Sequence, residues 1–408
     1  MSRPRPRARR WDYSTFLVGE PVYPALPLHV FQTLRDRLGS ASVVIDHEVR
    51  CAYSTPGPRP TSSPSRVSRA VSHRRRRPCP SDRPLCTLRR RYHPPMAKGD
   101  RAAMILHHLA NGGPLDGLGI GRVDGRLDLR DLSAPRPSVV GKRDLSFAKI
   151  KELGDLIQVE GRQWMDLDLS GSSLESVRFL GGTIVNCKFD RSKCKDLRMW
   201  DTSVVDTSFV GANLRGAVLG PVAQNGKRNQ FVNVDFSGAD LRNTVWQSAE
   251  ARSCAFRRAN LKNVKFNGTV FVDCRFEGRL EDVQFARHAF GYEALPPNDM
   301  CGVDFSSAEF HFVDFRRLDM GSVAWPSRDD HYLIEDYRTT LSKMIEVLRG
   351  RGDTVSARLR SMLEMLLKWA GEAQVKGVVS TEDLIASGGA EAVTVFTTLL
   401  RSVGARLH

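Results

Sequence analysis

Apolar side chains recur at every fifth position through the middle of the chain. From Trp164 to Leu219, twelve consecutive positions spaced five apart are apolar, although only 41% of all residues are apolar. Such a run arises by chance about twice in 100,000 trials, so the period reflects the fold. Two further runs with this period follow, residues 231–276 and, after one residue is dropped, residues 280–325, which include Phe290 and Leu295.

The residue two places before a large apolar centre is usually small, and Asp or Asn often stands between them. Examples are Ala-Asn-Leu at 212–214, Ala-Asp-Leu at 239–241 and Ala-Asn-Leu at 259–261. In extended backbone alternate side chains point the same way, so the centre and the small residue face inward together. Gly, Asn, Asp and Ser are common at the two remaining positions, where they favour a turn. Four such units close a square coil.

This pattern resembles the A(D/N)LXX repeat of the pentapeptide-repeat family, over roughly residues 120–327. The resemblance implies a mainly β fold, a right-handed quadrilateral β-helix, and the three runs of centres correspond to about eight coils. Residues twenty apart should then stack in columns. We expect one aromatic column of Phe236, Phe256 and Phe276 and a second of Phe285, Phe305 and Trp325. Cys254 and Cys274 should stack likewise, as buried free thiols or as a redox pair.

The flanks of the repeat predict covers for the open ends of the coil. Residues 96–163 give a short helix and a strand before the repeat at 164–327. Apolar residues at helical spacing then predict a C-terminal α-helical module over 328–408. An uncovered coil end leaves unpaired backbone groups, so we expect this module to be a cap. Some family members dimerise at this end, so the resemblance also implies a homodimer through 328–408.

The first 95 residues differ in composition from the rest. They hold 19 Arg, no Lys and 6 acidic residues, with Pro and Ser throughout. This composition predicts a disordered extension rich in Arg and Pro. The use of Arg alone favours read-through of DNA upstream of the true start, in which case the protein begins at Met96. The alternative is a basic arm that binds phosphates.

Charge and hydropathy bound the class of protein. Residues 96–408 carry 42 basic and 40 acidic side chains, so most of the net charge of +15 comes from the extension. No apolar run approaches the roughly 20 residues that span a bilayer, and no signal-peptide core is present. The eight Cys residues form no CxxC pair. We expect a soluble, cytoplasmic, bacterial protein with reduced thiols and no membrane partner.

No sequence pattern indicates catalysis. His107 and His108 are adjacent, so on a helix their side chains diverge by about 100° and cannot share a metal ion. The stretch from Gly220 to Arg228 lacks the spacing of a phosphate-binding loop. No Ser or Cys has an identifiable base. We predict no catalytic residue, no cofactor, no metal site and a protein that is not an enzyme.

Two sets of outward residues are candidates for binding. Apolar residues next to the centres of successive coils form a candidate partner surface: Met165, Leu180, Val185, Trp200 and Val205. Burial of this surface under residues 133–160 or under the C-terminal helices is the alternative. Basic residues gather on later coils as a candidate basic belt: Arg242, Arg252, Arg257, Arg258, Lys262 and Lys265. Ordinary solvation of these charges is the alternative.

The best-known role in the resembling family is DNA mimicry, in which an acidic rod occupies the DNA site of a type II topoisomerase such as gyrase. Residues 160–327 carry 21 basic and 21 acidic side chains, so this coil as a whole cannot present a phosphate-like potential. Only the acidic last coils favour mimicry. We expect a non-enzymatic scaffold that binds another protein; the alternatives are a gyrase modulator and a nucleic-acid binder that uses the basic belt.

Overall fold

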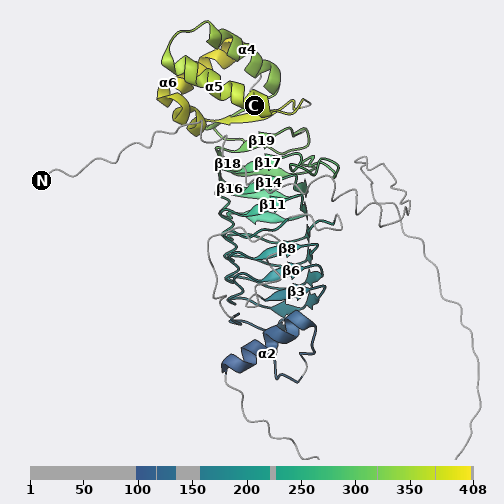
Figure 1. Cartoon of the computed structure of the whole chain (residues 1–408). Helices are drawn as coiled ribbons and strands as arrows, with labels where there is room; N and C mark the ends of the chain where they lie inside the picture. Colours follow the sequence, from purple (N-terminus) through teal and green to yellow (C-terminus); the bar gives the residue numbers. More distant parts are fainter. Residues whose placement is uncertain are drawn as a thin grey trace, which may run out of the picture. The chain divides into compact units, whose positions relative to one another are not determined.

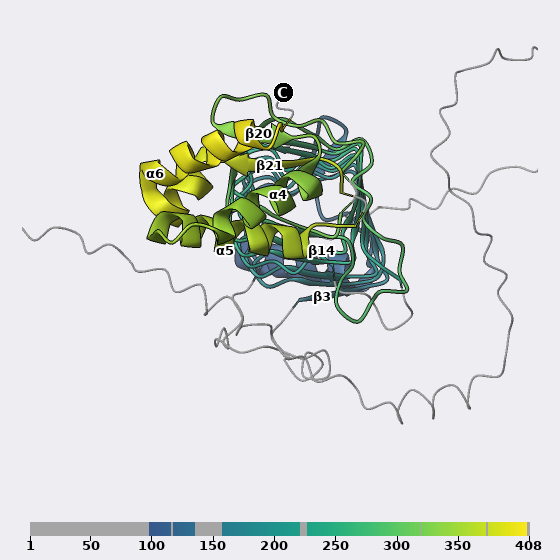
Figure 2. The ribbon, with the colours of Figure 1, turned by 90° about the horizontal axis from the view of Figure 1, so that it is seen from above.

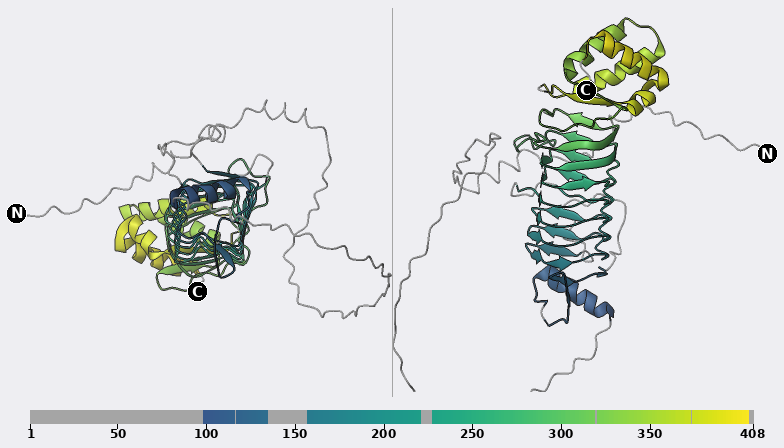
Figure 3. Two further views of the ribbon diagram at one scale, coloured as in Figure 1. Left: turned by 90° about the horizontal axis from the view of Figure 1, so that it is seen from below. Right: turned by 180° about the vertical axis from the view of Figure 1, so that it is seen from behind.

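Short parallel strands follow one another around a four-sided coil in the computed structural model of this chain (Figure 1). The structure describes residues 98–115, 117–134, 157–220, 227–318, 320–372 and 374–405. These residues belong to one unit of the chain, residues 89–408. The predictions made for residues 1–95 lie outside the described residues. Viewed along the coil axis, the strands outline the four sides (Figure 3).

The strands of each side pair with the coil before and the coil after. The longest sheet runs β4 (Gln163–Met165), β7 (Thr183–Val185), β9 (Ser203–Val205), β10 (Gln230–Val232), β12 (Glu250–Arg252) and β15 (Val270–Val272). The next side carries two sheets. The first consists of β3 (Gln158–Glu160), β6 (Arg178–Leu180) and β8 (Arg198–Trp200). The second consists of β11 (Val245–Gln247), β14 (Lys265–Asn267), β17 (Gln284–Ala286) and β19 (Asp314–Arg316).

The remaining strands complete the coil and its first turn. One sheet holds β13 (Ala255–Arg257), β16 (Arg275–Glu281) and β18 (Asp304–His311). Another holds β1 (Arg122–Val123), β2 (Arg126–Asp128) and β5 (Leu167–Asp168). Isolated parallel bridges connect the coils where no strand is formed, such as Asn213 with Asp240 and Asp240 with Asn260. The predicted mainly β solenoid is confirmed.

The inward centres stack as predicted in the middle of the coil. Phe236, Phe256 and Phe276 form one column, with ring centroids 5.2 and 4.6 Å apart and nearly parallel planes. All three side chains are at most 1% exposed. Offset stacking of this kind adds to the free energy gained by burying the rings.

The second predicted column is wrong. Phe285 stacks on Phe266 and Phe315, whereas Phe305 stacks on Phe276. The reason is an insertion between β17 and β18 that displaces the five-residue period. Two of the predicted inward centres fall in this insertion, and one of them, Phe290, is 86% exposed. The other, Leu295, is partly exposed.

A buried asparagine marks the return to the coil after each insertion. Asn229 donates from Nδ2 to the carbonyl of Met199 (2.8 Å) and accepts from the Thr202 N–H (2.9 Å). Asn298 accepts from the Phe271 N–H (3.1 Å). These side-chain bonds satisfy backbone groups of the preceding coil that an uninterrupted strand would have paired.

The corners of the coil require left-handed backbone, which explains their composition. Positive φ angles occur at Asn186 (52°), Asp206 (48°) and Gly211 (65°), among many equivalent corner residues. Asn, Asp and Gly adopt this region most readily. The polar residues between the apolar centres are therefore selected by backbone geometry.

Gly182 is the corner where substitution should cost most. Its φ is 94°, and a Cβ atom there would lie 2.2 Å from the carbonyl oxygen of Arg162. We expect Gly182→Ala to lower the free energy of unfolding by about 2–3 kcal/mol, because strain and a backbone clash add. Urea unfolding followed by circular dichroism measures this. Gly211→Asn is the control, because at φ 65° a Cβ there would meet only the Arg191 side chain at 3.4 Å; equal losses for both variants would contradict the prediction.

A helix covers the first end of the coil. Helix α2 (Lys98–Asn111) buries Ile105, Leu106 and Leu109 in the same core as the coil interior. The indole N–H of Trp164 donates to the Leu109 carbonyl at 3.1 Å, which ties the helix to the coil. The apolar face of α2 therefore closes the core at this end (Figure 1).

The C-terminal module has a core of its own. It contains α4 (Tyr337–Arg349), α5 (Thr354–Trp369), α6 (Thr381–Ser402) and the antiparallel pair β20 (His331–Ile334) and β21 (Gly377–Ser380). Figure 2 shows the three helices gathered over the end of the coil. Residues of the predicted helical period are buried in this second core, among them Ile334, Leu341, Met344 and Leu348. The module is helical as expected.

Helix α6 departs from the expectation that no segment could span a bilayer. Among the described residues it is the one helix whose length and composition would allow it to cross a membrane, and 28% of its most apolar window is buried in the protein. Its hydropathy comes from Ala, Val, Leu, Ile and Phe, and it carries few charges. The helix is interrupted at Gly388 and Gly389, whose backbone angles are not helical.

Candidate partner surface

The predicted apolar residues of the longest sheet form a continuous outward column. Strand register places Met165 beside Val185 and Val185 beside Val205 on β4, β7 and β9. Met165 is 45% exposed, and the two valines are partly exposed. Their neighbours in sequence, Trp164 and Ile184, are buried in the coil. Buried and outward side chains therefore alternate along these strands, as the sequence predicted.

The neighbouring side brings Leu180 and Trp200 together in the same way. They are paired residues of β6 and β8, and both are partly exposed. The C-terminal helices do not cover these strands, because α5 packs on β19 and the module bonds to the last coil. Most of the segment 133–160, the other cover considered, lies outside the described residues.

One member of the apolar column was missed by sequence reasoning. Val232 of β10 pairs with Val205 and is partly exposed, and Arg252 of β12 follows it. The insertion before β10 makes the spacing from Val205 to Val232 27 residues instead of twenty, so the spacing rule passed over it. The apolar column is thus Met165, Val185, Val205 and Val232, and it ends at a charge.

Two stacked arginines border Leu180 and Trp200. Arg178 is 3% exposed and lies beside Arg198 on the next coil. Its Nη1 donates to the carbonyls of Ser176 and Asp196, but the Nε atoms of Arg178 and Arg198 have no hydrogen-bond partner. Burial, reinforced by the Arg198 charge, lowers the pKa of Arg178 to about 10. The apolar surface is therefore flanked by positive charge.

The insertion between β17 and β18 presents a second apolar feature that the sequence reasoning assigned to the core. Phe290 stands at its tip, followed by Gly291 at φ 79°. The Glu293 carboxylate accepts from the Gly291 N–H (3.1 Å), and backbone N–H bonds to this carboxylate lower its pKa. An exposed aromatic side chain is typical of an anchor in a protein interface. The Pro296-Pro297 pair is the sequence signal that could have predicted a loop here instead of a continued coil.

The residues of the predicted basic belt are largely matched with acids. Ion pairs join Arg242 to Asp240 (2.6 Å), Arg252 to Glu250 (2.5 Å), Lys262 to Glu281 (2.6 Å) and Arg257 to Glu277 (3.5 Å). Hydrogen bonding to Lys262 lowers the pKa of Glu281. Arg258 and Lys265 are exposed. Arg252, Arg257 and Lys265 lie on β12, β13 and β14, which belong to three different sheets. The six residues therefore do not form one basic face.

Acids of the last coils are compensated in the same way. Asp304 pairs with Arg275 (3.5 Å), Glu309 with Arg328 (3.2 Å) and Asp314 with Arg316 (2.6 Å). Burial raises the pKa of Asp314. Interleaved opposite charges cancel at a distance, so the described acids of this end do not form one continuous acidic surface.

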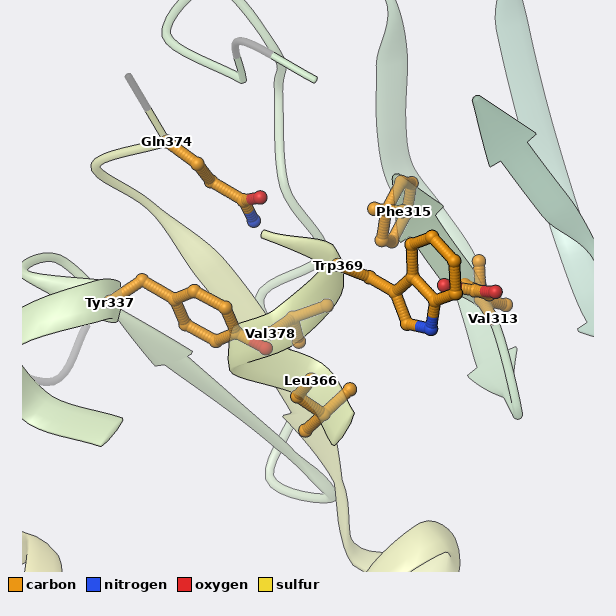
Figure 4. A pocket seen from close by; sticks show the side chains of 8 residues that line it. Val313, Phe315, Tyr337, Leu366, Trp369, Gln374 and Val378 are labelled. Atoms are coloured by element: carbon orange, nitrogen blue, oxygen red, sulfur yellow. The ribbon is translucent and has the colours of Figure 1, made fainter. Parts of the chain in front are cut away.

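A small cavity lies where the last coil meets the module (Figure 4). Its volume of about 20 Å³ suffices for about one water molecule. Lining residues include Asp314, Tyr337, Trp369 and Gln374. The Tyr337 hydroxyl is fully buried, and burial raises its pKa above the ordinary value. Within the described residues no group of three or more His, Cys, Asp or Glu side chains could hold a metal ion.

The stacked thiols lie inside the coil. Cys254 and Cys274 are free and buried, and each Sγ lies near a backbone carbonyl of the preceding coil, that of Phe231 (3.4 Å) and of Ala251 (3.3 Å). Contact with Cys274 and burial raise the pKa of the Cys254 thiol. Both observations favour structural thiols.

Comparison with known proteins agrees with the repeat. Residues 230–268 match the family model of pentapeptide repeats (8 copies). No curated protein sequence matches the chain significantly. Similar solved structures include a trypsin-treated variant of QnrB1, a plasmid-mediated fluoroquinolone resistance protein, at 15% identity over 50% of this chain and 86% of that one, with a TM-score of 0.32.

Two further solved structures are similar. HetL, a pentapeptide-repeat protein involved in heterocyst differentiation regulation in the cyanobacterium Nostoc sp. strain PCC 7120, is 12% identical over 54% of this chain and 82% of that one (TM-score 0.22). AT2G44920, a pentapeptide-repeat protein of the Arabidopsis thaliana thylakoid lumen, is 19% identical over 39% and 72% (TM-score 0.13). Because these scores are low, the assignment depends on the repeat match and the coil itself. Residues 230–268 of this chain are therefore pentapeptide repeats, and they belong to a coil of the kind that such repeats form.

Proposed function

We propose that this protein is a non-enzymatic scaffold of the cytoplasm that binds another protein through the side of its coil. The observation that carries the proposal is the outward apolar column on β4, β7, β9 and β10, together with Leu180 and Trp200 on the adjoining side. Apolar groups aligned over successive coils form a patch that a soluble chain rarely leaves uncovered.

The coil suits this role because it holds its surface residues at fixed spacing. Each outward side chain is anchored by a buried neighbour, as Val185 is by Ile184. Little conformational entropy is then lost when a partner binds. The buried Arg178 and the partly exposed Arg198 beside Leu180 favour a partner that brings carboxylates to the edge of the same patch.

A charge placed in the column tests the proposal. We expect Val205→Lys to reduce recovery of the partner at least tenfold in pull-downs from the source cytosol with a chain that begins at Met96, because a lysine must be desolvated there. The strand tolerates a cation at this position, since Arg252 occupies the same column two strands later.

Val272→Lys is the matched control. Val272 lies in the same column beyond Arg252 and is also partly exposed. A partner retained by Val272→Lys and lost by Val205→Lys supports the proposal. A partner bound equally by both variants and by the unaltered chain would place the interface elsewhere, with Phe290 the next residue to alter.

Modulation of gyrase by DNA mimicry remains the alternative function. The ion pairs of Asp304, Glu309 and Asp314 count against it, because mimicry needs uncompensated acids. A supercoiling assay decides: inhibition by micromolar protein would favour mimicry over the scaffold. Nucleic-acid binding through the basic belt is disfavoured by the same kind of pairing, and salt-dependent DNA binding by residues 96–408 would restore it.

A further inference from the structure

Three acceptors of the C-terminal module cap the last coil. The N–H of Phe310 donates to Nε2 of His331 (2.9 Å), and the N–H of Phe312 donates to the Asp383 carboxylate (2.9 Å). The N–H of Arg317 donates to the Trp369 carbonyl (2.8 Å). These donors lie at the open edge of the coil, where no further coil follows to accept them. Docking of the module therefore depends on these acceptors.

The bond from Phe310 requires a neutral His331. Its other ring nitrogen, Nδ1, lies 2.7 Å from the Asp330 carboxylate, so Nδ1 carries the proton and Nε2 offers its lone pair. The side chain of His331 is 2% exposed. Protonation would turn Nε2 into a donor that faces the Phe310 N–H, and one capping bond would be replaced by a repulsive contact.

His311 is held in the same protonation state. Its Nε2 lies 3.1 Å from Nη1 of Arg279, a group that can only donate, so Nε2 must offer its lone pair. Its Nδ1 lies beside the Glu382 carboxylate at the start of α6 without forming a regular hydrogen bond. Burial and the Arg279 charge lower the pKa of His311. A proton on Nε2 would set two cations against each other between the coil and the module.

Water and protons can reach both rings. A cavity of about 180 Å³ opens between the coil end and α6, and His311, His331, Asp330 and Glu382 are among the residues that line it. The two histidines therefore line one solvent-accessible space at the junction, and their titration does not require the core to open.

The acids and bases that face the histidines come from every element of the junction. The module contributes the carboxylates of Asp330, Glu382 and Asp383. The coil contributes Glu281 of β16, Asp282 of the turn after it and Glu309 of β18. The cations are Arg279 and Arg328. Hydrogen bonding to Arg328 holds the pKa of Asp330 well below its usual range. Burial raises the pKa of Asp383 and of Asp282.

We propose that the C-terminal module is an acid-releasable cap, which undocks from the coil end when His311 and His331 are protonated and so exposes the edge of β18. The docked state needs both rings neutral, so the released state binds more protons. The docked state lowers the pKa of His311, so docking is complete above the ordinary histidine pKa of about 6.5 and weakens as the pH falls below it. The raised pKa of Asp383 acts in the opposite sense, since it favours docking as that carboxyl becomes protonated.

Hydrogen exchange of the full chain tests the cap. Protection factors for the β18 and β19 region, corrected for intrinsic exchange, are measured at pH 7.5 and 5.5 by mass spectrometry. Each proton taken up changes the docking constant about tenfold per pH unit below the histidine pKa, so we expect at least a tenfold loss of protection at pH 5.5. Protection of the middle strands, such as β12, should not change.

Variants identify the histidines as the cause. His331→Gln keeps an oxygen acceptor for the Phe310 N–H and an N–H donor for Asp330 but does not titrate near neutral pH, so it should halve the logarithm of the pH effect, and the double variant that adds His311→Gln should be protected equally at both pH values. His311→Gln should halve the logarithm of the pH effect, and it serves also if His331→Gln fails to fold. His107→Gln, an exposed residue of α2, should behave as the unaltered chain. Unchanged protection of the unaltered chain, or a full pH effect in both glutamine variants, would overturn the proposal.

Discussion

Replacement of Phe256 by alanine should lower the free energy of unfolding by about 4 kcal/mol. The ring is fully buried and lies between Phe236 and Phe276, 5.2 and 4.6 Å away. Truncation removes the transfer free energy of a buried phenyl group, leaves a cavity and breaks two stacking contacts. The strands above and below are tied by their ladder bonds, so the cavity cannot close by local collapse.

Phe290→Ala is the control for this prediction. It removes the same side chain from a position that is 86% exposed, and we expect a change below about 0.5 kcal/mol. Urea unfolding monitored by circular dichroism gives both values, with the transition checked for steps because coils unfold as coupled neighbours. Comparable losses for the two variants would mean that the coil interior does not carry the stability.

Removal of the C-terminal module by ending the chain after Ser327 should convert a discrete species into large assemblies. The cut exposes the N–H groups of Phe310, Phe312 and Arg317 together with the apolar end of the core at Trp325. A flat strand edge beside exposed apolar surface pairs readily with another chain. Size-exclusion chromatography with light scattering at pH 7.5 measures the result.

A less drastic change provides the control for the truncation. Asp383→Asn keeps an oxygen that can accept from the Phe312 N–H, so the cap should remain docked and the species should match the unaltered chain. A truncated chain that stays a single discrete species at the same concentration would show that the coil end does not need its cover.

The five-residue period was sufficient to predict the solenoid and its inward residues. It placed Phe256 between Phe236 and Phe276 and predicted that Val185 would lie beside Met165, and both arrangements are observed. The reason is that the repeat is local: a side chain two or five residues along an extended, cornered chain has its direction fixed by its own backbone. Prediction therefore succeeded wherever the coils were uninterrupted.

The period could not show where a coil was interrupted. Phe290 and Leu295 fit the spacing but lie in an insertion, and the columns beyond it shift so that Phe305 stacks on Phe276. Within the window of one repeat, an apolar residue in a loop resembles one in the core. Only the pairing of whole coils distinguishes them, through bonds such as that from the Phe271 N–H to the side-chain oxygen of Asn298.

For the candidate surfaces, too, some features could be predicted from the sequence and others could not. Within uninterrupted coils the sequence by itself determined which residues face outward, and so it predicted the apolar column from Met165 to Val205. Only the tertiary structure decided which outward charges are matched, since partners such as Lys262 and Glu281 lie nineteen residues apart on adjacent coils. It alone also brought His331 to the N–H of Phe310. Direction is a property of one residue's backbone, whereas pairing is a property of two coils and depends on every insertion between them.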